Sequence, residues 1–452
     1  MPTIFARHAL LPEGWTADVA VEIGADGRIA AVTPGARDPG GPPRALLPAP
    51  SNLHSHTFQR AMAGRTERRG PEADSFWTWR ALMYRFLEAL DPDDVEAIAA
   101  LAFVEMQEAG FAAAAEFHYL HHGPGGVPYA DPAELSARIC AAAAETGIGL
   151  TLLPVLYAFG GADGRPLAGG QLRFGCDLNG FERLHEGAAR HLAGLPGDAR
   201  MGVAPHSLRA VGPEMLAGVA AAHPVGPVHI HAAEQPAEVR EVVARLGARP
   251  VEWLLDQGVD ARWCLIHATH MTPEETAGLA RSGAVAGLCP VTEGNLGDGV
   301  FDGARFLAAG GVFGIGTDSN VRIDLREELR LLEYGQRLRD GARNALLAAP
   351  GSSGALLWAG ALEGGCRALG REAGAIRVGA LADLVGLDAE HLALAGIGPD
   401  MWLDSLVFGP SDGAIRDVWS AGRHSVCDGR HVARERVEAR YRTRMGRLAA
   451  LL

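Results

Sequence analysis

The chain has 452 residues, of which 48% are hydrophobic and 21% charged, a composition typical of a soluble globular protein. This length suits two or three domains, or one α/β barrel with additions. The formal net charge of −13 argues against a nucleic-acid partner held through phosphate contacts, but a local arginine cluster can still bind a small anionic substrate.

The N-terminal stretch MPTIFARHALLPEGW lacks the basic segment, apolar run and cleavage site of a secretory signal. No segment approaches the ~20 apolar residues of a membrane span, so we expect a cytoplasmic protein with no membrane partner. The six cysteines are scattered without a CxxC pair, which indicates neither a disulfide framework nor a thiolate zinc site. All 41 basic residues are arginine, which excludes a Schiff-base lysine, a P-loop lysine and a lysine general base.

Short alternating runs such as DVAVEIG and RIAAVTPG occupy residues 1–46 and predict a small β unit. From about residue 46, apolar runs recur, each followed by a polar turn and a segment with helical spacing. The eight runs are ALLPAPSNL, FAAAAEF, IGLTLLPVLY, RMGVAPH, PVHIHAA, WCLIHA, AVAGLCP and GVFGIGTD. Several helical segments begin at Asp-Pro or Thr-Pro, as in DPDDVEAIAALAFVEMQEAG. Residues 47–372 are therefore predicted to form an α/β (β/α)₈ TIM barrel, with a long loop at 57–90 before its first helix.

Residues 373–452 return to short strands, as in AIRVGALADLVGLD, and end in the amphipathic pattern RERVEARYRTRMGRLAALL. Because the two ends of a chain often lie close together, we expect these strands to pair with those of residues 1–46. The expected result is a small β-sandwich domain built from both chain ends, followed by a terminal helix.

Residues of metal-ligating types follow four of the predicted strands, at the end where barrel enzymes carry their chemistry. They are His54, His56, His229, His231, Glu234, His267 and Asp318. His54 and His56 point the same way from an extended strand and can reach one ion. A single histidine at a strand end is usually structural, but four strand ends rarely gather such residues by chance. Three imidazoles and one carboxylate suit Zn²⁺, with Fe²⁺ or Mn²⁺ as alternatives, and such an ion lowers the pKa of a water molecule to near 7.

This arrangement resembles the amidohydrolase superfamily, with HxH after strand 1, histidines after strands 5 and 6, aspartate after strand 8 and a composite β-sandwich. Binuclear members bridge two metals with a carboxylated lysine after strand 4, which this chain lacks; its fourth run ends in APHSLR. The HxxE spacing from His231 to Glu234 is similar to the mononuclear deaminase branch.

The resemblance implies one metal ion per subunit. Its ligands would be His54, His56, His231 and Asp318. Glu234 would carry protons to the departing nitrogen, while His267 and Asp318 would orient or deprotonate the water. His229 lies deeper on the same strand and is expected to be buried and hydrogen-bonded.

Motifs along the whole chain resemble the N-formimino-L-glutamate deiminases of histidine degradation. They are SNLHSHTFQRAMAGRTE, FWTWRALMYRF, AEFHYLHH, APHSLRAV, HIHAAEQPAEV and LEYGQRLR. The resemblance implies hydrolysis of N-formimino-L-glutamate to N-formyl-L-glutamate and ammonia by a homodimer. Strand 1 is preceded by APSNL where the superfamily usually has PGxxDxH, which we interpret as a feature of this subgroup.

A substrate with two carboxylates and an amidine-like head needs planar cationic donors in its pocket. Arg80, after the first predicted strand, and Arg209, after the fourth, are placed to supply them. Gln59 and Tyr119 can add neutral hydrogen bonds. For His206, contact with substrate or water and a structural role are equally consistent with the sequence. Arg80 lies among the aromatic residues of SFWTWRALMYRF, in a loop that can cover the site.

The nearest alternative is another mononuclear deaminase of the same branch that acts on a purine, a pyrimidine or a related heterocycle. Its pocket would need neutral hydrogen-bonding groups and stacking aromatic rings in place of two arginines. A second alternative is a non-catalytic barrel that serves as a scaffold. The retention of all four expected ligands together with Glu234 and His267 argues against that reading.

Overall fold

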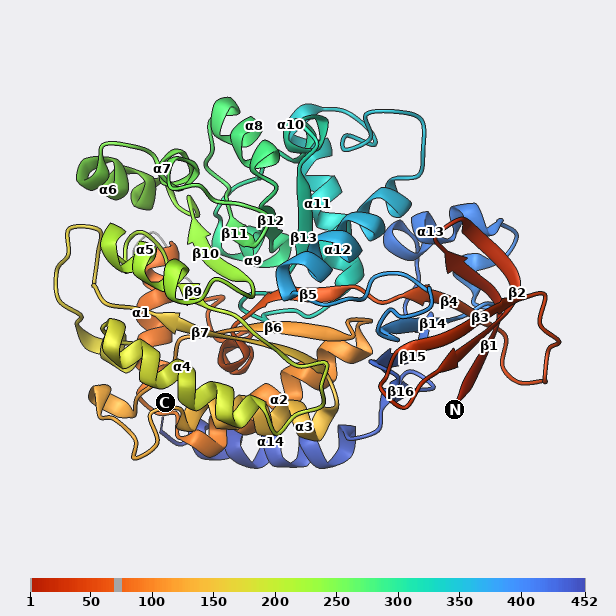
Figure 1. Cartoon of the computed structure of the whole chain (residues 1–452), viewed down its shortest axis with the longest axis horizontal. Helices are drawn as coiled ribbons and strands as arrows, with labels where there is room; N and C mark the ends of the chain where they lie inside the picture. The colour runs from red at the N-terminus through yellow and green to blue at the C-terminus, as the bar shows by residue number, and fades with distance from the viewer. Residues whose placement is uncertain (1, 69–74, 452) are drawn as a thin grey trace.

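Parallel strands alternating with helices fill the middle of the chain, in a computed structural model that describes residues 2–68 and 75–451 (Figure 1). Two sheets have the orders β5-β6-β7-β8, with β9 also paired to β7, and β10-β11-β12-β13. Their strands are β5 (Ser51–Ser55), β6 (Ala113–His118), β7 (Gly149–Leu156), β8 (Arg200–Met201), β9 (Ala204–Pro205), β10 (Val228–Ala232), β11 (Trp263–His267), β12 (Val285–Leu288) and β13 (Val312–Ile315). All eight apolar runs predicted as barrel strands form strands, the fourth as the two short pieces β8 and β9.

Backbone bridges join the two sheets at both seams. Val203, between β8 and β9, pairs in parallel with Val228 of β10. On the other side Ser55 of β5 pairs in parallel with Asp318, just beyond β13. The bridges place the strands in the ring order of a (β/α)₈ barrel, as predicted. The polar residues after β5, β10, β11 and β13 therefore meet at its carboxyl end.

Helices follow the barrel strands and begin at the predicted start signals. The Asp91 side chain accepts a hydrogen bond from the Asp94 N–H at 2.9 Å, and Thr272 caps the Glu275 N–H at 3.2 Å. These helices are α2 (Pro92–Glu108), α3 (Glu134–Thr146), α4 (Leu178–Leu192), α5 (Pro213–Ala222), α6 (Pro236–Leu246), α7 (Pro250–Asp256), α8 (Pro273–Ser282), α9 (Pro290–Leu296), α10 (Gly303–Ala308), α11 (Leu325–Asp340) and α12 (Ser353–Leu369). Among the described residues, no helix has both the length and the apolar character that a membrane crossing requires.

The segment 57–90, expected to be a loop, instead contains the 3₁₀ helix η1 (Thr57–Met62) and the helix α1 (Phe76–Leu87). The expectation was wrong because α1 has helical spacing of its own. Phe76, Met83 and Leu87 are buried on one face of it. Tyr84 of the same helix packs on Gly170 of the 3₁₀ helix η3 (Gly169–Arg173), which fixes α1 beside the barrel mouth.

Strands from both ends of the chain form one eight-stranded sheet in the order β17-β16-β15-β14-β4-β1-β2-β3. They are β1 (Thr3–Leu11), β2 (Gly14–Ile23), β3 (Ile29–Pro34), β4 (Arg44–Pro48), β14 (Leu384–Asp388), β15 (Ile415–Ser420), β16 (Arg423–Cys427) and β17 (Arg430–His431). β4 pairs with β14 in antiparallel and with β1 in parallel fashion. Residues of both ends, such as Val21 and Leu384, share an apolar core separate from that of the barrel.

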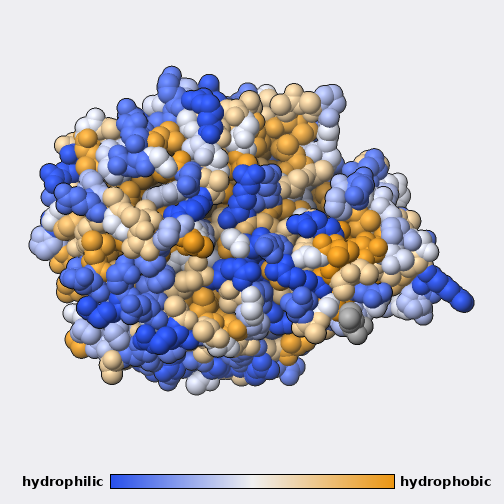
Figure 2. Space-filling model, viewed as in Figure 1, coloured by the Kyte–Doolittle hydropathy of each residue, from blue (hydrophilic) through white to orange (hydrophobic). Residues whose placement is uncertain are grey.

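The predicted terminal helix is α14 (Arg434–Ala449), which packs on α2. Arg444 of α14 lies 2.8 Å from Asp94 of α2. Hydrophilic residues predominate along the lower edge of Figure 2, where α14 lies in Figure 1. The remaining helices are η2 (Pro124–Gly126), η4 (Leu392–Leu394), η5 (Pro399–Met401) and α13 (Trp402–Phe408).

A buried charge network connects the barrel to the sheet. Arg371, after α12, has no exposed side-chain surface, and its Nη2 lies 2.9 Å from Asp383 Oδ2 and 3.2 Å from Asp198 Oδ2. Arg423, at the start of β16, binds Asp198 Oδ1 at 2.8 Å. Because Asp383 directly precedes β14 and Asp198 precedes β8, the network fixes the two parts of the fold against each other.

We expect Arg371→Leu to lower the free energy of unfolding by about 3–5 kcal/mol, because it leaves buried carboxylates without their cation. Unfolding in denaturant, followed by circular dichroism, measures the change. The control is Arg367→Leu, which removes an exposed pair with Glu363 and should change stability by no more than about 0.5 kcal/mol. Equal losses in the two variants would contradict the role of the network.

Candidate active site and metal centre

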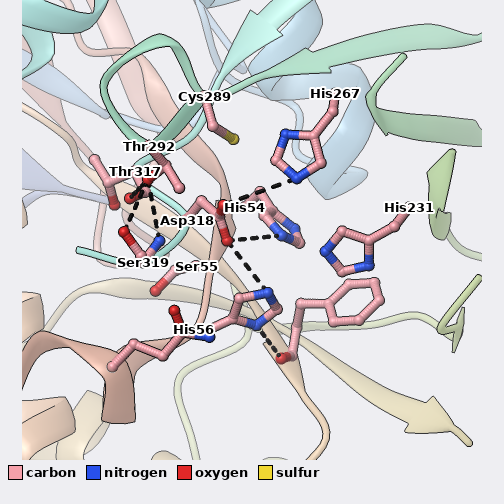
Figure 3. Close-up of polar contacts among 12 residues, drawn as sticks. His54, Ser55, His56, His231, His267, Cys289, Thr292, Thr317, Asp318 and Ser319 are labelled. Carbon is pink, nitrogen blue, oxygen red and sulfur yellow. Dashed lines mark hydrogen bonds and ion pairs between the residues drawn. The ribbon is translucent and has the colours of Figure 1, made fainter. Parts of the chain in front are cut away.

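Four side chains converge at the carboxyl end of the barrel: His54 from β5, His56 directly after it, His231 from β10, and Asp318 beyond β13 (Figure 3). One ligand atom of each lies within 4.8 Å of those of the other three. The Nε2 atoms of His54 and His56 are 3.4 and 3.3 Å from Asp318 Oδ1. Both ring nitrogens of His54 are buried without a hydrogen-bond partner, an arrangement that costs free energy unless a cation compensates it. The donor set therefore fits a metal ion.

Backbone carbonyls orient two of these imidazoles. Nδ1 of His56 donates to the Phe117 carbonyl at 3.0 Å, and Nδ1 of His231 donates to the His206 carbonyl at 3.1 Å. Such hydrogen bonds to the outer nitrogen fix the ring and its tautomer in metal sites. Burial lowers the pKa of His54 and of His231, which keeps them in the neutral form that binds metal.

A polar network holds Asp318 in its unusual backbone conformation. Its φ of +43° lies in the left-handed region, which is strained for a residue with a side chain. The side-chain amide of Asn320 donates to the Asp318 carbonyl, the His56 carbonyl and Ser55 Oγ at 3.0–3.1 Å. One amide group thus ties the aspartate to the strand that carries the two histidines.

Glu234 and His267 face each other beside these four side chains. Nε2 of His267 lies 3.7 Å from Glu234 Oε1 and 3.8 Å from Asp318 Oδ2, and its Nδ1 lies 3.2 Å from Glu293 Oε1. Burial alone would lower the pKa of His267, but the three carboxylates outweigh it and raise that pKa to about 10. Burial raises the pKa of Glu234 to about 7. Groups in such a cluster can hold and transfer protons near neutral pH.

Glu238, which sequence reasoning missed, fixes the backbone that presents Glu234. Its two carboxylate oxygens accept hydrogen bonds from the Ala233 and Glu234 N–H groups at 3.1 and 3.0 Å, and the residue is fully buried. The bonds hold Ala233 at a φ of +53°. A glutamate in the first turn of a helix is an ordinary start signal, so the pattern alone gives it no further role.

A cavity opens above this cluster. All substrate-binding candidates named from the sequence line it: Gln59, Arg80, Tyr119, His206 and Arg209. Gln59 Nε2 donates to Tyr119 Oη at 2.8 Å, and Arg209 Nη2 lies 3.9 Å from Glu234 Oε2. Burial, followed by the charge of Arg209, lowers the pKa of His206 and keeps its imidazole neutral. The fold thus gathers two guanidinium groups and several neutral donors over the candidate metal centre.

The helix α1 supplies one wall of the cavity. The guanidinium of Arg80 lies 4.4 Å from the ring centre of Trp77 and 5.6 Å from that of Tyr84, the aromatic surroundings that the sequence indicated. Tyr157 also lines the cavity and was missed, although its place directly after β7 was an available signal.

Two polar residues near these strands lie outside the site. His229 is buried, and its Nε2 donates to the Ala368 carbonyl at 2.8 Å, as expected. Arg60, within the 3₁₀ helix η1, binds Glu105 at 3.0 Å and does not line the cavity.

Comparisons with known proteins agree with this geometry. The model of the amidohydrolase family matches residues 45–424, and that of the "Formimidoylglutamate deiminase HutF, N-terminal domain" matches residues 1–44. The formimidoylglutamate deiminase of Pseudomonas aeruginosa is 52% identical over 445 residues, which cover 96% of this chain and 97% of the relative. The 8-oxoguanine deaminase of the same organism is 30% identical over 394 residues, which cover 85% of this chain and 82% of the relative.

Solved structures show the same fold. The crystal structure of an amidohydrolase from Brucella melitensis is 50% identical, with a TM-score of 0.95, and covers 99% of this chain and 100% of its own. The crystal structure of an adenosine deaminase from Xanthomonas campestris with bound zinc is 23% identical, with a TM-score of 0.81. The match covers 99% of this chain and 98% of that structure's chain. The chain belongs to the amidohydrolase family, in the branch of the formimidoylglutamate deiminases.

Proposed function

We propose that this chain hydrolyses N-formimino-L-glutamate to N-formyl-L-glutamate and ammonia, a step of histidine degradation, with one Zn²⁺ per subunit. The observation that supports this most is the presence of Arg80 and Arg209 in one cavity with Glu234, His267 and Asp318. The 52% identical relative named formimidoylglutamate deiminase supports the same substrate. The location is proposed to be cytoplasmic and the assembly homodimeric.

Arg80 and Arg209 are proposed to bind the two carboxylates of the substrate. A planar guanidinium matches a carboxylate with two parallel hydrogen bonds, and its charge is not lost at any physiological pH. The neutral groups of Gln59, Tyr119 and His206 complete the pocket. Because Arg209 also lies next to Glu234, one bound carboxylate brings the formimino head toward the proton-transfer groups.

His54, His56, His231 and Asp318 would hold the metal ion. When bound, zinc lowers the pKa of a water molecule to near 7 and so supplies a nucleophile at neutral pH. His267 and Asp318 orient the attacking water and take its proton. The water oxygen bonds to the formimino carbon while one proton of the water passes to His267 and Asp318, and Glu234 delivers the proton that it holds to the imino nitrogen, which becomes an amino group. Glu234 then takes the remaining proton from the added hydroxyl and delivers it to the amino nitrogen, so that the carbonyl forms and the bond from the carbon to this nitrogen breaks. The proton held by His267 and Asp318 returns to Glu234. Ammonia leaves, and the carbon remains as the formyl group.

We expect the zinc-loaded protein to release ammonia from N-formimino-L-glutamate at least about 100-fold faster than from guanine, cytosine or adenosine.

In Glu234→Gln, kcat should fall by about 10²–10⁴ while the metal content stays normal, because the amide cannot transfer the proton. A coupled ammonia assay and elemental analysis measure both. Glu241→Gln, which changes a residue of α6 paired with Arg165, is the control. Preferred turnover of a heterocycle would favour the alternative deaminase, and normal turnover in Glu234→Gln would exclude the role of Glu234.

We expect His231→Asn to lose most of its bound metal, because the imidazole that completes the donor set is gone. His229→Asn is a matched control on the same strand, since His229 is bonded to the Ala368 carbonyl instead. Elemental analysis after dialysis gives the metal per chain for each variant. If both variants retain metal equally, His231 is not a ligand.

We expect Arg209→Met to raise KM for N-formimino-L-glutamate by about 10–100-fold, because the substrate loses one charge-assisted hydrogen bond in a buried pocket. Arg80→Met should act in the same direction. Steady-state kinetics of these variants are compared with Arg245→Met, which changes an exposed arginine of α6. An unchanged KM in both pocket variants would reject the assignment of the carboxylate sites.

A further inference from the structure

The two carboxylate oxygens of Asp318 face two different sets of donors (Figure 3). Oδ1 is the oxygen near His54 and His56, at 3.4 and 3.3 Å. Oδ2 faces away from that pair and lies 3.8 Å from Nε2 of His267. A carboxylate in this position can bridge two cations, each bound to one oxygen.

A second group of ligand atoms lies on the Oδ2 side. His267, Cys289 and Asp318 are all buried, and one ligand atom of each lies within 4.8 Å of the other two. Within residues 2–68 and 75–451, Cys289 is the one cysteine that belongs to such a group. The cysteines are scattered in the sequence, but the pairing of β11, β12 and β13 brings the ends of three strands together here.

Neighbouring groups orient His267 and Cys289, and the nitrogen of His267 that belongs to this group has no hydrogen-bond partner. Glu293 Oε1 contacts His267 Nδ1 at 3.2 Å and accepts a hydrogen bond from the Cys289 N–H at 2.9 Å. One carboxylate therefore orients both residues, in the way that outer carboxylates support metal ligands. Nε2 of His267 has no hydrogen-bond partner, and the side chain is only 1% exposed.

We propose that His267, Cys289 and Asp318 form a second, inhibitory site for a divalent cation that prefers sulfur, such as Cd²⁺ or excess Zn²⁺. A thiolate, an imidazole and a carboxylate are the ligand types of these ions. When a cation binds the sulfur of Cys289, the thiol releases its proton to solvent. The carboxylates of Asp318 and Glu293 at this site favour the binding of a doubly charged cation.

Occupation of this site removes His267 from proton transfer, because its Nε2 releases its proton to solvent and becomes a metal ligand. The loss of turnover rests on the proposed function, whereas the binding of a second ion does not. Binding and turnover are therefore measured separately.

The experiment starts from protein stripped with a chelator and reloaded with one equivalent of zinc. Cadmium chloride is added stepwise, and the near-ultraviolet absorption of a thiolate–cadmium bond, the metal bound per chain and the rate of ammonia release are followed. The variants are Cys289→Ala and Cys289→Ser, with Cys140→Ala as a control for a buried cysteine of α3. Thermal melting shows that each variant is folded.

Wild-type protein and Cys140→Ala should bind one equivalent of cadmium in addition to zinc, show the absorption band, and lose turnover at least tenfold in parallel. In both Cys289 variants the band should be absent, and the ratio of rates with and without cadmium should stay near one. The proposal is overturned if wild-type protein shows no band, if the band persists in the Cys289 variants, or if cadmium only replaces zinc. If a second ion and the band appear but the protein releases no ammonia from any substrate, the proposed function fails and the site stands.

Discussion

The hydrogen bonds between the first and last barrel strands are the constraint on which the site depends. The His54 carbonyl accepts from the Asp318 N–H at 2.9 Å, so the strand with two imidazoles and the strand end with the carboxylate are held in register. A shift of one residue at this seam would turn every side chain of the strand to the opposite face. The strained backbone of Asp318 is tolerable only because Asn320 and the seam define it from both sides.

Much of the fold is visible in the sequence because barrel strands are short, apolar and buried on both faces. The eight runs, the start signals of α2 and α8, and the terminal helix α14 were all local patterns. The helix α1 was missed because its polar flanks and the neighbouring glycines and arginines read as a loop. The division of ALLPAPSNL into β4 and β5 was also missed, since only the three-dimensional pairing shows that one run serves two sheets.

The site shows the same division between local and spatial information. His54, His56, His231 and Asp318 were recognisable because each follows an apolar run, and strand ends are a local feature. The residues that orient Glu234 and His267 could not be recognised in this way. Glu238 acts on the backbone of Glu234, and Glu293 acts on the His267 ring from 26 residues away. Both look like ordinary helix-start glutamates in the sequence, and only the three-dimensional packing of α6 and α9 reveals their partners.

The passage from β4 to β5 has a consequence for how the molecule can be divided. β4 is paired on both sides, with β1 and β14, and the chain then runs through Ala49 and Pro50 directly into the strand of His54 and His56. A barrel fragment that begins at β4 and lacks the rest of the terminal sheet would carry β4 without β1 and β14. The unpaired N–H and C=O groups of such a strand promote edge-to-edge aggregation. The terminal sheet is thus no detachable accessory, and the catalytic barrel has no natural point of excision on its N-terminal side.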